Sequence, residues 1–342
     1  MFTFVTHLII MPSWLAFWGS MVIIPGSTSL ALARSVSGML DVPMVIPCVS
    51  RFADGEINLE VPTGVATGSG HVVLMQSLSA PASDNLIELT LLTDAVRRTL
   101  APQRITAVIP YLCYSRQDRV MQRVDSQETF TSALSAKVIA RILSTSGLDH
   151  IVTLDLHSQQ AAGFFDVPFT NISAYDVFVD YLSGSNLLER LVIVSPDYGA
   201  LGRVRAFVRM LSSRYNMNSI QVAVIDKYRE GPGISEVMHV VGNVQDRHCF
   251  ILDDIVDSGG TLCNAAAALK TRGAISVHSF ITHGVLSGRA IDAIGTAELD
   301  SLVITDTIHN PNRVNLPEKI KVLSVDRLLS DYLLSHAVWR KS

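Results

Sequence analysis

The hydrophobic positions of the chain fall into short apolar runs that alternate with longer amphipathic stretches. Eight runs rich in β-branched residues are typical of strands: 72–76, 105–109, 150–154, 191–194, 220–225, 249–252, 276–282 and 302–305. Five stretches have the three- and four-residue apolar spacing of helices: 84–99, 135–146, 202–213, 261–271 and 327–336. Residues 21–36 (MVIIPGSTSLALARSV) fit a further strand, turn and helix. This alternation predicts an α/β fold in which parallel sheets are flanked by helices.

Residues 1–20 (MFTFVTHLIIMPSWLAFWGS) depart from this pattern, since they are apolar and aromatic throughout. The first basic residue of the chain is Arg34, whereas a secretory signal carries positive charge before its apolar core. Pro12 interrupts the run, which is short for a membrane helix. We therefore expect an extension outside the fold, or a start site assigned too early, with a membrane-associated segment as the alternative.

Composition narrows the class of protein. The chain has 342 residues, enough for two domains, and 48% of them are hydrophobic. Its formal net charge of -4 and low charged content (17%) do not favour binding to nucleic acid or to an acidic membrane. The four cysteines share no metal-ligand spacing, and we expect reduced core residues of a cytoplasmic protein: Cys48, Cys113, Cys249 and Cys263.

The segment 250–261 (FILDDIVDSGGT) carries the most specific chemistry. An apolar strand leads into the acids Asp253 and Asp254, then into a small polar loop and a helix that starts near Thr261. Free N–H groups at such a helix start favour a phosphate, and the two acids can accept hydrogen bonds from sugar hydroxyls. A phosphorylated pentose satisfies both. The alternative is a turn whose Thr261 only caps the helix.

Polar residues also follow other predicted strands. His157, in Asp155-Leu156-His157, and Asp197 could share a Mg²⁺ ion that keeps several waters. Each could instead be structural, His157 as a packed histidine and Asp197 as a helix cap. Lys227 and Arg229 precede a glycine-containing loop, where two cations could neutralise charge on a transferring phosphoryl group.

Two further segments offer contacts for a nucleotide. Residues 51–56 (RFADGE) contain an aromatic ring and two acids, which suit a base and its hydroxyls. Residues 116–118 (RQD) follow a strand-like run and could contact a polyphosphate. Turn and surface positions explain either segment equally well when each is taken alone.

In chain order, these motifs make the sequence resemble one family, the ribose-phosphate pyrophosphokinases, also called phosphoribosyl pyrophosphate synthetases. The matching blocks run from about residue 21 to near the C-terminus: RFADGEINLEV, QSLSAPASDNLIEL, IPYLCYSRQD, LSAKVIARIL, DLHSQQAAGFFDVP, VSPDYGALGRVRA, IDKYR, ILDDIVDSGGTL and THGVLSG. The resemblance implies two phosphoribosyltransferase-like α/β domains, which we place at residues 21–173 (ATP side) and 174–342 (ribose-5-phosphate side).

The resemblance also implies an activity and its participants. The family transfers the β,γ-diphosphoryl group of ATP to the C1 hydroxyl of ribose 5-phosphate, releases AMP, uses Mg²⁺ and supplies nucleotide biosynthesis. It binds ATP between domains and partly through a neighbouring subunit. We accordingly expect a cytoplasmic homo-oligomer built from dimers, with a hexamer as one form, and neither nucleic acid nor a stable membrane association as a partner.

The resemblance assigns roles by motif. The implied ATP contacts are Phe52, Asp54, Gly55, Glu56, Arg116 and Gln117. The implied ribose-5-phosphate contacts are Arg229, Asp253, Asp254, Asp257, Ser258, Gly259, Gly260 and Thr261. His157 and Asp197 match the metal positions, Lys227 matches the catalytic lysine, and Arg229 acts beside it.

The sequence departs from the family pattern after residue 118. The connection VMQRVDSQETFTSAL is longer and less basic than the corresponding loop of allosteric members, which puts phosphate activation and ADP inhibition in doubt. Two other functions compete with an active synthetase. A catalytically silent, synthetase-like subunit would be expected to lose the metal histidine, the lysine or the phosphate loop, and a phosphoribosyltransferase needs only about half this length.

Overall fold

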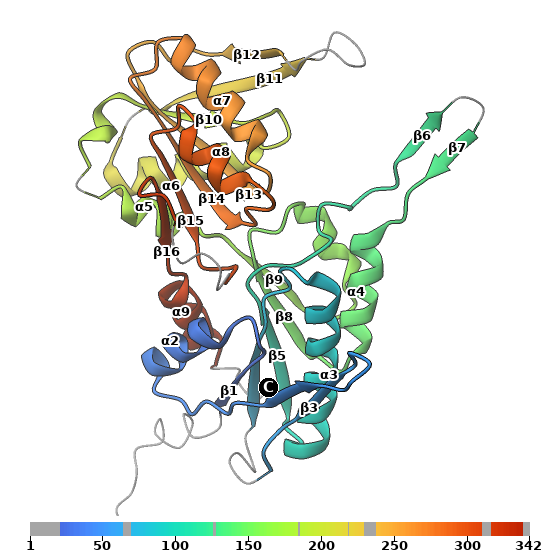
Figure 1. Ribbon diagram of the computed structural model, residues 1–342. Helices are drawn as coiled ribbons and strands as arrows, with labels where there is room; N and C mark the ends of the chain where they lie inside the picture. Colours follow the sequence, from blue (N-terminus) through green and yellow to red (C-terminus); the bar gives the residue numbers. More distant parts are fainter. Residues whose placement is uncertain are drawn as a thin grey trace, which may run out of the picture.

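The computed structural model describes residues 21–63, 70–125, 128–183, 185–217, 219–228, 237–309 and 316–337. It has two lobes, each built around its own sheet (Figure 1). The expected extension, residues 1–20, lies outside the described residues. Within the described part of the chain, no helix is both long enough and apolar enough to cross a membrane.

The N-terminal lobe contains a five-stranded sheet in which all neighbours are parallel. Its order is β1 (Met21–Pro25), β4 (His71–Met75), β5 (Arg104–Ile109), β8 (His150–Leu154) and β9 (Phe169–Ile172). Strand β1 shows why both faces need cover: Val22 and Ile24 pack in one core cluster, and Met21 and Ile23 in another. Alternate side chains of a strand point to opposite faces, so a fully apolar strand predicts a sheet with helices on both sides.

Four helices provide that cover. α3 (Ala82–Leu100) and α4 (Ser135–Thr145) pack on the face of Val22, and α2 (Leu30–Leu40) packs on the face of Met21. The last helix of the chain, α9 (Asp326–Ala337), joins α2 on this second face through Leu329 and Leu333. Ser35 Oγ donates a 2.5 Å hydrogen bond to Asp326 Oδ2. A boundary at residue 174 assigns α9 to the C-terminal half by chain order, but its contacts belong to the N-terminal core.

The C-terminal lobe contains a seven-stranded sheet. Its order is β12 (Val237–Val241), β11 (Gln221–Tyr228), β10 (Leu191–Ser195), β13 (His248–Val256), β14 (Ser276–Gly284), β15 (Ser301–Thr305) and β16 (Ile320–Leu323). Only β11 and β12 pair antiparallel. One face packs against α7 (Gly260–Thr271) and α8 (Ala290–Thr296), the other against α5 (Tyr175–Tyr181) and α6 (Leu201–Tyr215). The predicted α/β class, with two mainly parallel sheets flanked by helices, is confirmed.

Two small hairpins and two 3₁₀ turns complete the described elements: β2 (Cys48–Arg51) with β3 (Ile57–Glu60), β6 (Gln122–Asp125) with β7 (Glu128–Thr131), η1 (Gln159–Phe164) and η2 (Asn186–Arg190). The β6–β7 hairpin is the connection after residue 118, and it projects away from the N-terminal lobe (Figure 1). Cys113 and Cys249 are buried and Cys263 is half-buried, but Cys48 is exposed on β2, so the expectation of four core cysteines is wrong for Cys48.

One strand differs from its predicted extent in a way that matters for the site. The run 249–252 was predicted to end where the acids begin, yet β13 continues to Val256. The reason is its neighbour: β14 pairs with β13 as far as Val256 and Gly284, whereas pairing with β10 ends at Ile251. Asp253 and Asp254 therefore lie within β13, beyond the end of β10, where one edge of the strand is open.

Candidate functional site

The predicted phosphate loop connects β13 to α7. Gly259 has a φ of +79°, a left-handed conformation that favours glycine, and a Cβ there would lie 3.2 Å from the side chain of Ile294. The next residue, Gly260, begins α7, and Cys263 N donates the first helical hydrogen bond to Gly259 O at 2.9 Å. The preceding N–H groups are those that a helix start leaves for an anion.

A cavity of about 250 Å³ lies against this loop, and both lobes line it. The C-terminal lobe contributes most of the lining, and the N-terminal lobe contributes two polar side chains, Arg116 and His157. The predicted residues around this one cavity are Arg116, His157, Asp197, Asp253, Asp254, Asp257, Ser258, Gly259 and Thr261. Residues from both predicted substrate sites and from the predicted metal site therefore converge.

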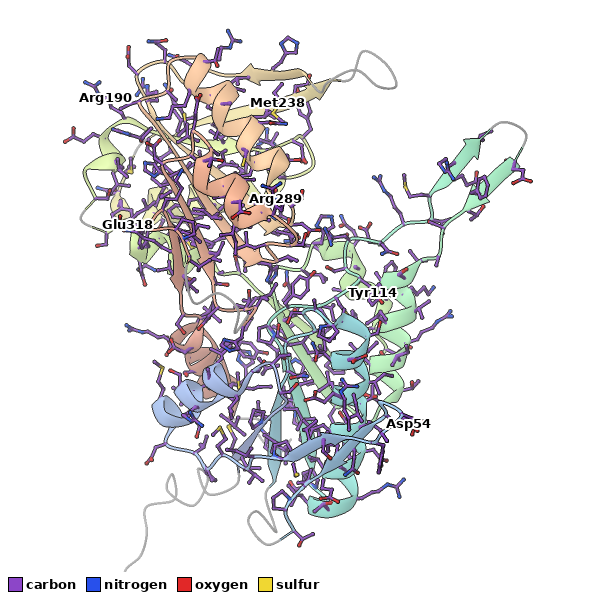
Figure 2. All side chains as sticks on the ribbon, viewed as in Figure 1. Asp54, Tyr114, Arg190, Met238, Arg289 and Glu318 are labelled. Carbon is purple, nitrogen blue, oxygen red and sulfur yellow. The ribbon has the colours of Figure 1, made fainter. Side chains whose placement is uncertain are left out.

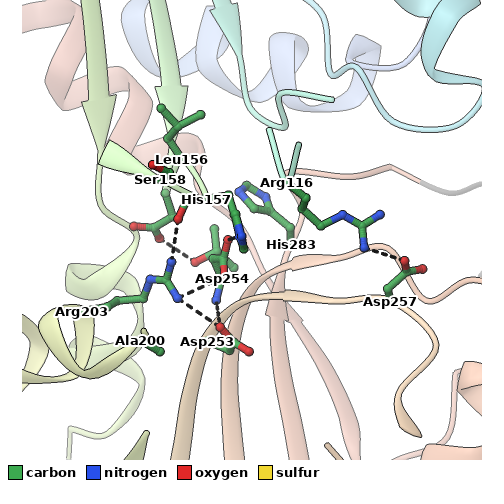
Figure 3. Close-up of polar contacts among 12 residues, drawn as sticks. Arg116, Leu156, His157, Ser158, Ala200, Arg203, Asp253, Asp254, Asp257 and His283 are labelled. Atoms are coloured by element: carbon green, nitrogen blue, oxygen red, sulfur yellow. Dashed lines mark hydrogen bonds and ion pairs between the residues drawn. The ribbon is translucent and has the colours of Figure 1, made fainter. Parts of the chain in front are cut away.

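Ionic contacts join the two lobes across the cavity (Figure 3). Arg116 Nη1 donates a 2.7 Å hydrogen bond to Asp257 Oδ2 in the phosphate loop. On the other side, His157 Nδ1 lies 2.8 Å from Asp254 Oδ2. Both pairs match a cation or imidazole of the N-terminal lobe with a carboxylate of the C-terminal lobe, so the site holds the lobes together.

Arg203, in the first turn of α6, connects this set of contacts. Its Nη1 lies 3.0 Å from Oδ1 of Asp253 and 3.0 Å from Oδ1 of Asp254, and its Nη2 donates to the carbonyl of His157 at 3.3 Å. Arg203 is not among the residues predicted from the sequence, because an arginine in an amphipathic helix resembles a solvated surface residue. Its position six residues after Asp197 in the block VSPDYGALGRVRA was the available signal.

These contacts set the protonation of the acids. Burial and the charge of the adjacent Asp254 raise the pKa of Asp253. Burial also acts to raise the pKa of Asp254, but the hydrogen bond with His157 and the charge of Arg203 outweigh it, so the pKa of Asp254 is lowered. The hydrogen bond with Asp254 raises the pKa of His157. Asp254 is only 2% exposed and bonds to both partners, so in this structure it links the lobes.

The phosphate loop has its own stabilising contacts. Ser287 Oγ donates a 2.5 Å hydrogen bond to Asp257 Oδ1, and Ser287 N donates to the backbone oxygen of Asp257 at 3.1 Å. The hydrogen bond from Ser287, followed by that from Arg116, lowers the pKa of Asp257. Ser287 belongs to the THGVLSG block, which the sequence analysis matched as a whole without assigning a role to the serine.

The predicted metal residues, His157 and Asp197, line the same cavity. Asp197 Oδ1 accepts a 2.9 Å hydrogen bond from Ala200 N, so the capping role also holds. Among the described residues, no group of three or more histidine, cysteine or acidic side chains could enclose a metal ion. This donor set fits a Mg²⁺ ion that keeps waters and substrate phosphates as ligands, rather than a closed protein cage.

A second cavity, of about 700 Å³, adjoins the first and shares Arg116 with it. Gln117 lines this second cavity only, and its Oε1 accepts a 2.5 Å hydrogen bond from Ser135 Oγ. The remaining linings come from residues 78–82, from Tyr111 and its neighbours, and from residues 285, 308 and 309. Of the predicted ATP-phosphate contacts, Arg116 thus lies between the two cavities and Gln117 lines the second.

The segment predicted to bind the base, Phe52 with Asp54, Gly55 and Glu56, is not part of either cavity in the same chain. It connects β2 to β3, and Phe52 is 57% exposed. Figure 2 labels Asp54 at the edge of the lower lobe and Tyr114 near the junction between the lobes. The structure therefore separates the predicted base contacts from both cavities of the same chain.

The predicted catalytic cations are only partly described. Lys227 lies near the end of β11, where its backbone pairs with Met238, and its side chain is not described. Arg229 and the loop after it lie outside the described residues. Their roles stay predictions from the sequence.

Comparisons with known proteins cover nearly the whole chain. Residues 21–147 match the N-terminal domain of ribose phosphate pyrophosphokinase, and residues 214–338 match the phosphoribosyl synthetase-associated domain. A ribose-phosphate pyrophosphokinase of Brucella melitensis is 42% identical across 91% of this chain and 95% of its own length. One from Bradyrhizobium diazoefficiens is 41% identical across 92% and 93%. The crystal structure of phosphoribosylpyrophosphate synthetase from Mycobacterium smegmatis superposes with a TM-score of 0.78, at 30% identity, and covers 92% of this chain and 98% of its own.

Proposed function

Because the chain belongs to the ribose-phosphate pyrophosphokinase family, we propose that it transfers the β,γ-diphosphoryl group of ATP to the C1 hydroxyl of ribose 5-phosphate. The products are phosphoribosyl pyrophosphate and AMP, and the product serves nucleotide biosynthesis. The enzyme works in the cytoplasm. The observation that carries this proposal is the cavity in which the phosphate loop 257–261 of one lobe faces Arg116 and His157 of the other.

Different residues around the cavity bind the two substrates. The 5-phosphate of the sugar binds at the start of α7, where the helix dipole and the free N–H groups favour an anion. Asp253, partly exposed beside this loop, accepts hydrogen bonds from the sugar hydroxyls. Arg116 contacts the ATP phosphates, and to do so it exchanges its carboxylate partner Asp257 for a phosphate oxygen.

No covalent enzyme intermediate is needed for this transfer. The C1 hydroxyl attacks the β-phosphorus in line with the departing AMP oxygen, so the chain mainly has to position the substrates and neutralise charge. Lys227 and Arg229 neutralise the charge that develops on the transferring group. Asp254, held ionised by His157 and Arg203, fixes the side chains from the two lobes around the reacting atoms.

His157 and Asp197 would hold Mg²⁺, with waters and substrate phosphates as its further ligands. When bound, the ion supplies charge neutralisation on the phosphate oxygens. The Asp197 carboxylate is a hard oxygen donor of the kind that Mg²⁺ prefers, which supports this assignment.

A homo-oligomer completes the site. The ring of Phe52 and the acids Asp54 and Glu56 are exposed on the β2–β3 hairpin, away from the cavities of their own chain. A neighbouring copy therefore supplies them to the adenine of ATP, in an assembly built from dimers. The exposed hairpin β6–β7 replaces the short basic loop of allosteric members, and we propose that phosphate activation and ADP inhibition are weak or absent.

The test is release of AMP from ATP by the purified chain, with each component omitted in turn. We expect AMP only when ribose 5-phosphate and Mg²⁺ are both present. A silent subunit would release none, and a phosphoribosyltransferase would not consume ATP but would release pyrophosphate from phosphoribosyl pyrophosphate and a base.

A further inference from the structure

A second polar network lies behind the cavity, buried between the two lobes. We infer that this network, made by Asp155, Thr282, His283 and Thr307 and called here the junction cluster, is a positioning device that holds His157 in register with the phosphate loop. The inference rests on the proposed function, because it assigns residues to the geometry of that reaction. All four side chains are 7% exposed or less.

Asp155 is the first residue after β8, two positions before His157. Its φ of +35° is a left-handed conformation that a non-glycine residue rarely adopts, so neighbouring contacts must hold it there. Its Oδ2 accepts a 2.6 Å hydrogen bond from Thr282 Oγ1 of β14, and a 3.0 Å bond from Ala174 N. Thr282 thus fixes, from the opposite lobe, the turn that leads into His157.

His283 makes the second connection between the lobes. Its Nε2 lies 3.1 Å from the carbonyl oxygen of Leu154, which can only accept, so Nε2 carries the proton and donates. Its Nδ1 lies 3.0 Å from Thr307 Oγ1, and the Thr307 hydroxyl has two acceptors in reach, this nitrogen and the carbonyl oxygen of Thr282 at 3.1 Å. Burial lowers the pKa of His283, which agrees with this neutral form. The ring also lies edge-on to Tyr111, at 5.1 Å between centroids.

A third bond extends the cluster to the strand β4. Ser77 Oγ, just after that strand, donates a 2.6 Å hydrogen bond to the backbone oxygen of Thr307. Three bonds between side chain and partner therefore cross from one lobe to the other: Thr282 to Asp155, His283 to Leu154 and Ser77 to Thr307. Buried bonds of this kind resist sliding, because any shift leaves polar groups without partners and away from water.

The cluster is placed where such a shift would disturb the reaction. Leu156, between Asp155 and His157, donates its backbone N–H to Asn171 Oδ1 at 2.8 Å, so the whole turn from 154 to 157 is fixed. His157 and Arg116 are the polar side chains that the N-terminal lobe adds to the cavity, whereas the phosphate loop belongs to the C-terminal lobe. Loosening the cluster should therefore separate the two halves of the site without altering the phosphate loop itself.

The experiment compares Thr282→Val, which removes the donor hydroxyl at nearly constant size, with Thr282→Ser, which keeps it. We expect Thr282→Val to lower kcat by roughly 10- to 100-fold, the range that a small misplacement of reacting groups produces. The dissociation constant for ribose 5-phosphate alone, measured by calorimetry, should stay within about twofold of the wild-type value, because its loop is unchanged. Thr282→Ser should restore kcat.

Two controls keep the test sharp. Thr93→Val removes another fully buried hydroxyl, which donates to Leu89 O within α3 at 2.8 Å, and should leave kcat unchanged. If Thr282→Val does not fold, Thr307→Val removes the hydroxyl that contacts His283, Thr282 O and Thr305 Oγ1, while the Ser77 bond to the backbone of Thr307 remains. The same split between kcat and ribose-5-phosphate affinity is then expected.

A measurement without turnover tests the cluster separately from the reaction. Amide hydrogen exchange at residues 155–157 should speed up roughly tenfold in Thr282→Val and return to the wild-type rate in Thr282→Ser. Unchanged exchange, kcat within twofold of wild type, a parallel loss of ribose-5-phosphate affinity, or failure of serine to restore kcat would each overturn the inference. A wild-type chain that releases no AMP would instead overturn the proposed function, while the exchange result would still decide the role of the cluster.

Discussion

Arg116 Nη1 lies 2.7 Å from Asp257 Oδ2, so an arginine of the N-terminal lobe neutralises the phosphate loop of the C-terminal lobe. Both side chains are partly exposed to the cavity, at 48% and 35%. A partly exposed ion pair of this kind contributes little to stability, and a doubly charged phosphate can replace the carboxylate. Under the proposed function, this contact marks where the phosphates of the two substrates meet.

Replacing Arg116 tests this meeting point. We expect Arg116→Ala to raise the KM for ATP at least roughly tenfold, because a charge-assisted, bidentate phosphate contact is lost. Arg116→Lys should give an intermediate KM. Arg98→Ala offers a matched control, because Arg98 forms an exposed ion pair of the same 2.7 Å length with Asp94 on α3. Steady-state kinetics measure all three variants. A KM for ATP within twofold of wild type in Arg116→Ala would exclude Arg116 as a phosphate contact.

The two glycines of the phosphate loop should behave differently. Gly259→Ala places a side chain in a left-handed conformation and 3.2 Å from Ile294, so we expect a loss of roughly 1 kcal/mol in stability. We also expect at least roughly tenfold weaker binding of ribose 5-phosphate. Gly260→Ala adds a Cβ whose nearest neighbour is Ser258 Oγ at 4.0 Å, so its stability should match the wild type. Urea unfolding measures the stability of both variants, and calorimetry measures their affinity for ribose 5-phosphate. Wild-type affinity in Gly259→Ala would show that this loop does not bind the sugar phosphate.

Mixing two inactive variants tests whether neighbouring copies share the site. Phe52→Ala removes the proposed adenine contact, and Lys227→Ala removes the proposed catalytic cation, so each alone should lose most of its turnover while Lys227→Ala keeps its ATP affinity within a few-fold. Random exchange of subunits should restore about a quarter of wild-type activity, because half of the pairs at an interface are mixed and one of the two sites in each mixed pair carries both intact residues. Absence of any recovery after confirmed subunit exchange would show that each chain uses its own segment.

The loss of folding stability at acid pH should come from two histidines at the N-terminal ends of strands in the N-terminal sheet. Burial, followed by the charge of Arg104, lowers the pKa values of His71 and His150 to about 4 from the ordinary 6.5. The unfolded chain binds more protons between these values, so this part of the stability is complete above about pH 6.5 and is lost as pH falls toward 4. Each histidine should lower the free energy of unfolding by roughly 1 to 2 kcal/mol at pH 5 relative to pH 7. Urea midpoints at pH 7 and 5 measure the loss.

The variant His150→Gln separates this effect from other titrations. Glutamine keeps polar contact with its surroundings but cannot gain a charge. The loss of stability between pH 7 and pH 5 should therefore be smaller in this variant by the contribution of one histidine. An unchanged difference would mean that His150 is already free to ionise in the folded chain.

The sequence predicted the central strands and helices because they carry strong periodic patterns. Fully buried strands such as 150–154 and 191–194 match β8 and β10 closely. The hairpins β2–β3 and β6–β7 and the edge strand β12 escaped notice, since short strands with exposed side chains lack a clear pattern. Packing of α9 on α2 could not be foreseen either, because it joins segments nearly 300 residues apart through contacts with no local signature.

The site was predictable to the extent that its motifs lie on strand ends. His157, Asp197 and Asp257 follow β8, β10 and β13, Asp253 lies within β13 beyond the end of β10, and all four line one cavity. Pairwise contacts were not predictable, as His157 and Asp254 show, because the contact between them depends on how the two lobes pack. For the same reason the sequence identified DLH and THG as motifs but not the bond between Asp155 and Thr282.

The most direct test of the account is to identify the products formed from ATP, ribose 5-phosphate and Mg²⁺ by chromatography and mass spectrometry. We predict AMP and phosphoribosyl pyrophosphate in equal amounts, with no AMP when ribose 5-phosphate is left out. Formation of ADP with a sugar that has gained one phosphate at C1 (ribose 1,5-bisphosphate), or no consumption of ATP by folded protein, would contradict the transfer of a diphosphoryl group.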